Sequence, residues 1–255
     1  MWDPTQYAKY AEHRSRPFFD LTARIDAAAP RLVYDLGCGP GELTAALGER
    51  WPDTQIVGVD NDPAMLERAA RHATERVSFQ HGDLAELLPP VDTDVVVSNA
   101  AYQWVDNNVA LLRQIAERLP VGGWLAVQVP GNFSAPSHVT IRGLVGEPQW
   151  QERTGGLQLR TDPVLDAAGY GDVFAMAGLL VDTWETTYNQ VLDGDDPVLE
   201  WVKGTALRPV LDALDAEGQR DFIAELRPRL RAAYPASAAG TVFAFRRIFA
   251  VGHRP

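Results

Sequence analysis

Thiols and long apolar segments are scarce in this chain of 255 residues. Its one cysteine, Cys38, excludes a disulfide within the chain and a metal centre built from several thiolates. Residues 1–17 are polar and lack the apolar segment of a secretory signal peptide. No apolar run approaches the length needed to span a bilayer. We therefore expect a cytoplasmic protein that does not associate with membranes.

Positive charge is scarce as well. The chain has 23 lysine and arginine residues against 34 aspartate and glutamate residues, with a formal net charge of −11 and a pI near 4.9. Proteins that bind nucleic acid normally carry a basic face, so neither nucleic acid nor an anionic membrane is an expected partner. Only Lys9 and Lys203 are lysines. Arginine suits paired hydrogen bonds to a carboxylate, although genomic codon bias also explains such a preference.

Short apolar runs alternate with helical segments in the first half of the chain. The composition, 46% hydrophobic and 22% charged, is that of an ordinary globular protein. The spacing predicts five strands, at residues 32–36, 55–59, 76–80, 94–98 and 123–129. Because apolar strands alternate with helices, we expect a parallel sheet that is covered by helices on both faces.

The second half predicts two more strands, at 181–188 and 241–251, where β-branched and aromatic residues are frequent. A helical stretch at about 197–234 separates them. The expected fold is α/β: a Rossmann-like, seven-stranded, mostly parallel sheet with one antiparallel edge strand, helices on both faces and a helical insertion near the C-terminus. We expect one domain over 1–255, with a binding core at 30–130 and helical cap elements at 1–29 and about 195–240.

A glycine-rich loop follows the first predicted strand. Asp35 closes the strand, and Gly37, Gly39 and Gly41 alternate before a helix. Glycines adopt positive φ and allow a ligand to approach the backbone closely, and such loops bind ligands at the carboxyl ends of parallel strands. The dinucleotide fingerprint has a different spacing, and the carboxylate of Asp35 would repel a pyrophosphate. It suits a ligand with an ammonium group, such as S-adenosylmethionine.

Polar residues follow the next three predicted strands. Asp60 lies about 20 residues after the loop, where a carboxylate accepts hydrogen bonds from ribose hydroxyls. Asp83, followed by Leu84, can accept from an adenine amino group, and the segment around Asn99 can meet the methionyl part of the cofactor. Asp60 and Asp83 are also explained as turn or helix-capping residues. With Asn61, which follows Asp60, these residues complete the predicted cofactor-binding set.

The glycine loop with Asp60 and Asp83 resembles the class I methyltransferases. The likeness narrows with five further segments that resemble the trans-aconitate 2-methyltransferase family over nearly the whole chain, except at 162–168. These segments are Arg14-Ser15-Arg16-Pro17, Ser98-Asn99-Ala100 with Gln103-Trp104, Trp184-Glu185-Thr186-Thr187-Tyr188, Leu207-Arg208-Pro209 and Arg247-Ile248-Phe249. The resemblance implies that S-adenosylmethionine methylates one carboxylate of trans-aconitate to give a methyl ester.

A carboxylate is ionised at neutral pH and needs no general base to attack a sulfonium methyl group. We therefore expect catalysis by positioning alone, with no catalytic acid or base and no metal. A polyacid requires a local positive cluster in so acidic a protein. Arg16 is expected to hold the cofactor's carboxylate. The expected acceptor-binding residues are arginines and aromatic residues: Tyr7, Arg14, Trp104, Tyr188, Arg208 and Arg247.

Four alternatives stay open at the level of sequence. A methyltransferase for a larger apolar metabolite would need an apolar pocket without the arginines. An NAD(P)-dependent oxidoreductase conflicts with the glycine spacing, and a nucleic-acid amino-methyltransferase conflicts with Asn99-Ala100-Ala101-Tyr102 after the fourth strand. A regulator that binds the cofactor without catalysis is compatible with the intact aspartates. The sequence predicts a monomer or a homodimer.

Overall fold

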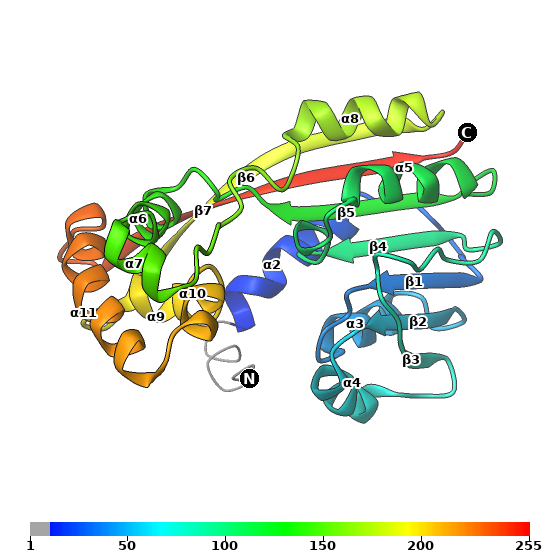
Figure 1. Cartoon of the computed structure of the whole chain (residues 1–255). Coiled ribbons are helices and arrows are strands. Elements are labelled where there is room, and N and C mark those ends of the chain that lie inside the picture. The colour runs from blue at the N-terminus through cyan, green and yellow to red at the C-terminus, as the bar shows by residue number, and fades with distance from the viewer. Residues whose placement is uncertain (1–10) are drawn as a thin grey trace. The chain divides into compact units, whose positions relative to one another are not determined.

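The computed structural model describes the backbone of residues 11–255 and the side chains from Ser15 onward (Figure 1). The described chain divides into two compact units. The core unit contains residues 14–130, 163–186 and 247–255, and the helical unit contains, of the described chain, residues 11–13, 131–162 and 187–246. Residues 14–29, expected in a helical cap, group with the core unit. The helical unit includes the expected segment 195–240 and is larger than expected.

A seven-stranded sheet confirms the predicted fold class. Its strand order is β3-β2-β1-β4-β5-β7-β6, and neighbours from β3 to β5 are parallel, whereas β7 is antiparallel to β5. The antiparallel strand β7 lies one position inside the edge, because β6 is outermost. The strands are β1 (Leu32–Leu36), β2 (Gln55–Asp60), β3 (Val77–His81), β4 (Val95–Asn99), β5 (Trp124–Pro130), β6 (Leu180–Leu192) and β7 (Thr241–His253).

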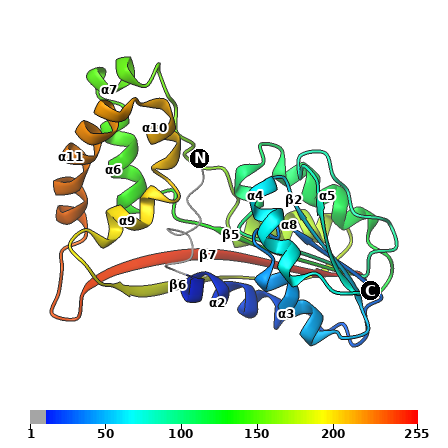
Figure 2. The same cartoon turned by 90° about the horizontal axis from the view of Figure 1, so that it is seen from below.

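Alternate residues of each strand divide the core unit into two layers of side chains. Leu36, Val59, Val96 and Val127 belong to the cluster packed beneath helices α5 (Asn108–Arg118) and α8 (Ala167–Met176). Helices α2 (Ala11–Thr22) and α3 (Glu42–Arg50) cover the other face (Figure 2). The predicted arrangement, with helices on both faces, is therefore present.

Local capping explains where several helices of the core unit begin. Asp62 accepts a hydrogen bond from the Ala64 amide at 2.8 Å and precedes α4 (Pro63–Ala69), as the Asp-Pro pair predicts. Asp166 caps α8 through the Gly169 amide. Two short 3-10 helices complete the core unit, η1 (Ala70–His72) and η2 (Tyr102–Trp104).

The helical unit has its own hydrophobic cluster, in which Trp150 and Phe222 meet edge to face at 4.9 Å. The helices of this unit lie close together (Figure 2). The predicted helical stretch is confirmed as three helices, α9 (Pro197–Lys203), α10 (Arg208–Ala213) and α11 (Ala216–Ala233). Two further helices were not expected, α6 (Pro136–Val145) and α7 (Pro148–Arg153). Each begins with a proline, which is readily interpreted as part of a turn.

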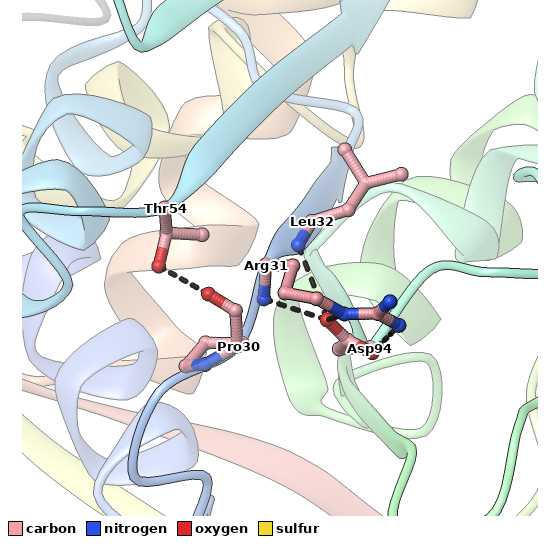
Figure 3. Close-up of polar contacts among 5 residues, drawn as sticks. All are labelled: Pro30, Arg31, Leu32, Thr54 and Asp94. Atoms are coloured by element: carbon pink, nitrogen blue, oxygen red, sulfur yellow. Dashed lines mark hydrogen bonds and ion pairs between the residues drawn. The ribbon is translucent and has the colours of Figure 1, made fainter.

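The amino ends of β1 and β4 are tied together by one carboxylate (Figure 3). Asp94 accepts from the Arg31 amide at 2.6 Å, from the Leu32 amide at 3.3 Å and from the Arg31 guanidinium at 2.9 and 3.2 Å. Burial raises the pKa of Asp94, but these hydrogen bonds outweigh it and the pKa is lower than usual. This contact fixes the sheet at the end opposite the glycine loop.

Candidate active site

The sheet order reverses between β1 and β4, so the chain leaves these two neighbouring strands toward opposite faces of the sheet. In open α/β sheets, ligands bind at such a point, beyond the carboxyl ends of the strands. Here the loops that follow the two strands pack directly on each other, because a Cβ added to Gly37 would overlap the Cβ of Ala101. The candidate site therefore begins at this junction.

The three loop glycines all have positive φ, but they meet different surroundings. Gly37 has φ 82° and Gly41 has φ 88°, and a Cβ on Gly41 would lie 2.8 Å from the Ala69 Cβ. Gly39 has φ 55°, and no atom lies within 4 Å of the position that a Cβ would take there. Two glycines therefore satisfy packing within the protein, whereas the third leaves the backbone open to a ligand.

Asp35 is buried beneath this loop, at 3% exposure. The Thr44 hydroxyl donates to Asp35 Oδ2 at 2.6 Å. Burial raises the pKa of Asp35 to about 6; the Thr44 hydrogen bond opposes this rise, and the negative charge of Asp60 adds to it. A cation beside Asp35 would stabilise its ionised form.

Asp60 links the glycine loop to the turn after β2. Its Oδ2 accepts from the Gly39 amide at 2.8 Å, and its Oδ1 accepts from the Asp62 amide at 2.9 Å. The turn interpretation of Asp60 therefore applies. Each carboxylate oxygen has a second lone pair, so ribose binding by the same carboxylate stays compatible with these contacts.

The residues expected around the adenine and beside Asp60 lie at the ends of β2 and β3. Asp83 is exposed, and its Oδ1 accepts from the Ala85 amide at 2.9 Å, as its turn interpretation predicts. Leu84 is buried, and Asn61 is exposed. The adenine contact of Asp83 stays a prediction, as do the roles of Asn61 and Leu84.

The end of β4 combines an unusual backbone with an unsatisfied amide. Ala100 has φ 58°, a left-handed conformation that alanine rarely adopts. Its amide donates to the Gln128 carbonyl at 2.8 Å, which holds this conformation. Within the described residues, the buried Oδ1 of Asn99 has no hydrogen-bond partner. A donor from a ligand would satisfy this oxygen.

The arginines expected to bind an acceptor differ in setting. Arg247, in the core unit, is 6% exposed on β7 and donates from one terminal nitrogen to Gln128 Oε1 at 3.3 Å. Arg208, in the helical unit, begins α10, and its Nε lies 3.5 Å from Asp212 Oδ2. Arg16 on α2 has a side chain that is 71% exposed, with its Nε 3.8 Å from Asp20 Oδ2. Their binding roles stay predictions.

The expected aromatic residues differ in burial. Trp104 is 62% exposed on η2, whereas Tyr188 is buried on β6 in the helical unit. Trp184 is half-buried, and its ring stacks on Phe249 with ring centroids 4.7 Å apart. Tyr7 and the side chain of Arg14 lie outside the described residues.

Sequence reasoning missed two buried amides, Gln128 on β5 and Asn132 just after it. In the part of the chain that the structure describes, Gln128 Nε2 and both side-chain atoms of Asn132 have no hydrogen-bond partner. The sequence contains a pattern that could have indicated Gln128: it is the one polar residue between Trp124 and Pro130, a run otherwise typical of a buried strand.

The described residues contain no group of three or more side chains suited to bind a metal ion. Burial raises the pKa of Cys38, so this thiol is a packing group and not a nucleophile. Burial and Arg142 lower the pKa of His138 to about 4, which keeps this imidazole neutral. None of the described helices is both long and apolar enough to cross a membrane.

Comparison with known proteins agrees with this geometry. A family model described as a methyltransferase domain matches residues 33–123, which span the glycine loop and the following strands. Among solved structures, the YcgJ protein from Bacillus subtilis superimposes with a TM-score of 0.57 at 16% identity, covering 94% of this chain and 99% of the other. A phosphoethanolamine N-methyltransferase from Haemonchus contortus in complex with S-adenosyl-L-methionine gives 0.52 at 15% identity, covering 94% and 53%. These likenesses show the fold.

Curated relatives extend the comparison to the whole chain. A trans-aconitate 2-methyltransferase from Rhodococcus jostii is 50% identical, with 98% of each chain covered. The protein of the same name from Streptomyces coelicolor is 49% identical and covers 100% of this chain and 87% of its own. Identity at this level over almost the full length shows that the chain belongs to the trans-aconitate 2-methyltransferase family, whose members use S-adenosylmethionine.

Proposed function

We propose that this protein transfers the methyl group of S-adenosylmethionine to one carboxylate of trans-aconitate, giving a monomethyl ester and S-adenosylhomocysteine. The observation that carries the proposal is the 50% identity to a trans-aconitate 2-methyltransferase over 98% of both chains. The sequence-based expectation of a cytoplasmic monomer or homodimer, without nucleic-acid or membrane partners, is kept as part of the same proposal.

The residues present fit the cofactor. The open backbone at Gly39 and the buried carboxylate of Asp35 suit a ligand with an ammonium group, and a ligand donor would satisfy Asn99 Oδ1, which has no partner among the described residues. We assign the ammonium group to the vicinity of Asp35 and the ribose to Asp60. We assign the adenine to Asp83 with Asn61 and Leu84, and the carboxylate to Arg16. When bound, S-adenosylmethionine supplies an electrophilic methyl group on its sulfonium.

The protein's task is then to position the acceptor. A carboxylate is ionised at neutral pH and can attack without a general base. Arginines neutralise the carboxylates that do not react, so that a polyanion can approach a protein of net charge −11. Holding the reacting oxygen in line with the methyl group and excluding water supply the rate enhancement. We assign acceptor binding to this set: Tyr7, Arg14, Trp104, Tyr188, Arg208 and Arg247.

The test uses purified protein, methyl-labelled S-adenosylmethionine and four acids in parallel: trans-aconitate, cis-aconitate, isocitrate and citrate. Base-labile label on trans-aconitate is the expected result, because methyl esters hydrolyse in alkali. Cofactor binding without transfer to any acid would instead identify a non-catalytic regulator. In the same assay, Asp60→Ala is expected to weaken cofactor binding, whereas Arg208→Ala is expected to raise the KM for the acid. Equal loss of both in Arg208→Ala would contradict its assignment.

A further inference from the structure

Gln128 is a completely buried amide in the middle of the core unit's sheet. It is 0% exposed, and every other residue from Trp124 to Pro130 is apolar. Burying an amide without its hydrogen bonds is unfavourable, so such a residue is rare unless it has a partner. One side of the amide has a protein partner, since Oε1 accepts from the Arg247 guanidinium at 3.3 Å.

The contact with Arg247 fixes how the amide is oriented. A guanidinium only donates hydrogen bonds, so the oxygen of Gln128 must face it and the NH₂ group must face away. This NH₂ group, Nε2, has no partner among the residues that the structure describes. The orientation therefore presents two unused donors, which require an acceptor atom.

The strand register places other polar groups beside these donors. Gln128 pairs with Asn99 on β4 and with Phe249 on β7. Residues paired across neighbouring strands share one face of the sheet, and Arg247 shares the face of Phe249 because it is two residues away. Asn99, Gln128 and Arg247 therefore form a polar strip at the carboxyl ends of β4 and β5. The stacked rings of Trp184 and Phe249 flank this strip.

The strip lies next to the candidate cofactor site. Asn99 immediately precedes Ala100, whose loop packs on Gly37. The opposite face of β5 carries Val127 and Val129, which belong to the hydrophobic cluster beneath α5 and α8. The Gln128 side chain therefore points to the face away from that cluster, the face that also carries Asn99.

A neutral donor suits the carboxylate that reacts. A guanidinium bonded to the attacking oxygen would withdraw the negative charge that the oxygen needs to attack the methyl group. An amide orients the carboxylate through one oxygen and leaves its charge intact. Arg247, held by Gln128 Oε1, then provides positive charge for a neighbouring carboxylate that does not react.

We propose that Gln128 selects and orients the methyl-accepting carboxylate: its NH₂ group donates to that carboxylate, while its oxygen positions Arg247. The inference rests on the proposed function. The attacking carboxylate oxygen forms a bond to the methyl carbon as the carbon–sulfur bond breaks and its electron pair returns to sulfur. No proton moves in this step, and Gln128 remains an amide throughout.

The test compares Gln128→Glu and Gln128→Leu with the wild-type protein. Gln128→Glu keeps the size and the acceptor for Arg247 but removes the donors, and Gln128→Leu removes both. Each is expected to lower kcat/KM for trans-aconitate by roughly 10- to 100-fold, mainly through KM, with the Kd for S-adenosylmethionine changed less than about twofold. In Gln128→Glu, kcat/KM relative to that of the wild-type protein is expected to rise as the pH falls, because the introduced carboxyl group becomes a donor when protonated.

Gln190→Leu is the matched control, since Gln190 is also a buried glutamine, on β6 in the helical unit, with its Oε1 unpartnered in the described structure. It is expected to retain the wild-type KM. An unchanged KM in both Gln128 variants, or a rise in KM just as large in Gln190→Leu, would overturn the inference. Wild-type protein that methylates none of the acids would overturn the proposed function, and this inference with it. Variants that lose folded protein are detected by their cofactor Kd, and a purely structural role would weaken cofactor binding and acid binding together.

Discussion

At the scale of single residues, the glycine loop separates packing from ligand contact. Gly37 and Gly41 are required by neighbouring protein atoms, whereas Gly39 faces open space. A substitution at Gly39 therefore reports on the ligand. The two carboxylates also differ, because Asp60 accepts from backbone amides on both oxygens, whereas Asp35 is buried with a raised pKa and accepts from the Thr44 hydroxyl.

We expect Gly39→Ala to weaken S-adenosylmethionine binding by at least about tenfold, because a methyl group would occupy the open side of the loop. The left-handed φ costs the alanine variant only about 1–2 kcal/mol of unfolding free energy. Calorimetric titration and urea denaturation measure the two effects. Gly122→Ala is the control. Gly122 has φ 81° and equally open surroundings, but it precedes the amino end of β5, whereas the glycine loop follows the carboxyl end of β1. Equal cofactor affinity in both variants would contradict this role of Gly39.

Cofactor affinity is expected to fall as the pH is lowered through about 6, because protonated Asp35 no longer attracts an ammonium group. Folding stability changes with pH in the opposite direction to cofactor affinity. Because folding raises the pKa of Asp35, protonation of Asp35 stabilises the folded protein fully below the unfolded pKa near 4, and this contribution is lost as the pH rises through about 6. Asp35→Asn should therefore raise the unfolding free energy at pH 7.5, by roughly 1–3 kcal/mol, while weakening cofactor binding. Denaturation and titration at pH 5 and 7.5 test both. An Asp35→Asn variant that is less stable at pH 7.5 would contradict the account.

At the scale of helices and strands, polar contacts stabilise the sheet at the amino ends of β1 and β4, whereas the candidate site lies at the carboxyl ends of these strands. Asp94 joins the amino ends of β1 and β4, and Thr54 donates to the Pro30 carbonyl at 2.6 Å nearby (Figure 3). The glycine loop and Asn99 lie at the carboxyl ends. Stability and function can therefore be changed separately.

Asp94→Ala is expected to destabilise the protein by about 1–3 kcal/mol, because the amides of Arg31 and Leu32 lose their acceptor. Since the pKa of Asp94 is lowered, its contribution is present above pH 4 and is lost as the pH falls below that value. Urea denaturation measures the change, and the KM for the acid should stay within twofold of wild type. Asp53→Ala, at a 99% exposed side chain near Arg76, should have almost no effect. If Asp53→Ala lowered the unfolding free energy as much as Asp94→Ala does, the stabilising role of the contact between β1 and β4 would be contradicted.

The elements differ in how far the sequence predicts them. The first five strands are predicted to within about two residues at each end, because each is a short apolar run bounded by turn residues. Strand β7 is predicted within the same margin, whereas β6 continues to Leu192, beyond its predicted end at 188, because Asn189 and Gln190 interrupt the apolar pattern. Helices α6 and α7 were missed, since Pro136 and Pro148 resemble turn residues.

The candidate site shows a similar limit. Asp35, the three glycines and Asp60 can be predicted, because their spacing in the sequence follows one strand–loop–helix unit. The role proposed for Gln128 could not be predicted from the sequence. It depends on the register of Gln128 with Asn99 on β4 and on its contact with Arg247, which is distant in the sequence. Residues that act through neighbouring strands require the structure.

At the scale of the whole molecule, the chain builds two hydrophobic clusters, one in each unit. The described residues assigned to the cofactor all belong to the core unit. Of the residues proposed to bind the acceptor, Arg247 belongs to the core unit, and Arg208 and Tyr188 belong to the helical unit. A change within the helical unit should therefore affect the acid more than the cofactor.

Phe222→Ala should lower the unfolding free energy by about 3–5 kcal/mol, because it leaves a cavity beside Trp150 in the helical unit. At a temperature where the variant is folded, its Kd for S-adenosylmethionine should match the wild type, whereas its KM for trans-aconitate should rise. Phe174→Ala makes a similar cavity in the core unit's cluster and serves as the comparison. A tenfold weaker cofactor affinity in Phe222→Ala would contradict this division of roles.

The most direct test offers the purified protein equal concentrations of trans-aconitate and cis-aconitate with S-adenosylmethionine, and follows the products by NMR and mass spectrometry. The account predicts one monomethyl ester of trans-aconitate, formed in equal amount to S-adenosylhomocysteine. Cofactor turnover without an ester of either acid, or preferential methylation of cis-aconitate, would contradict it.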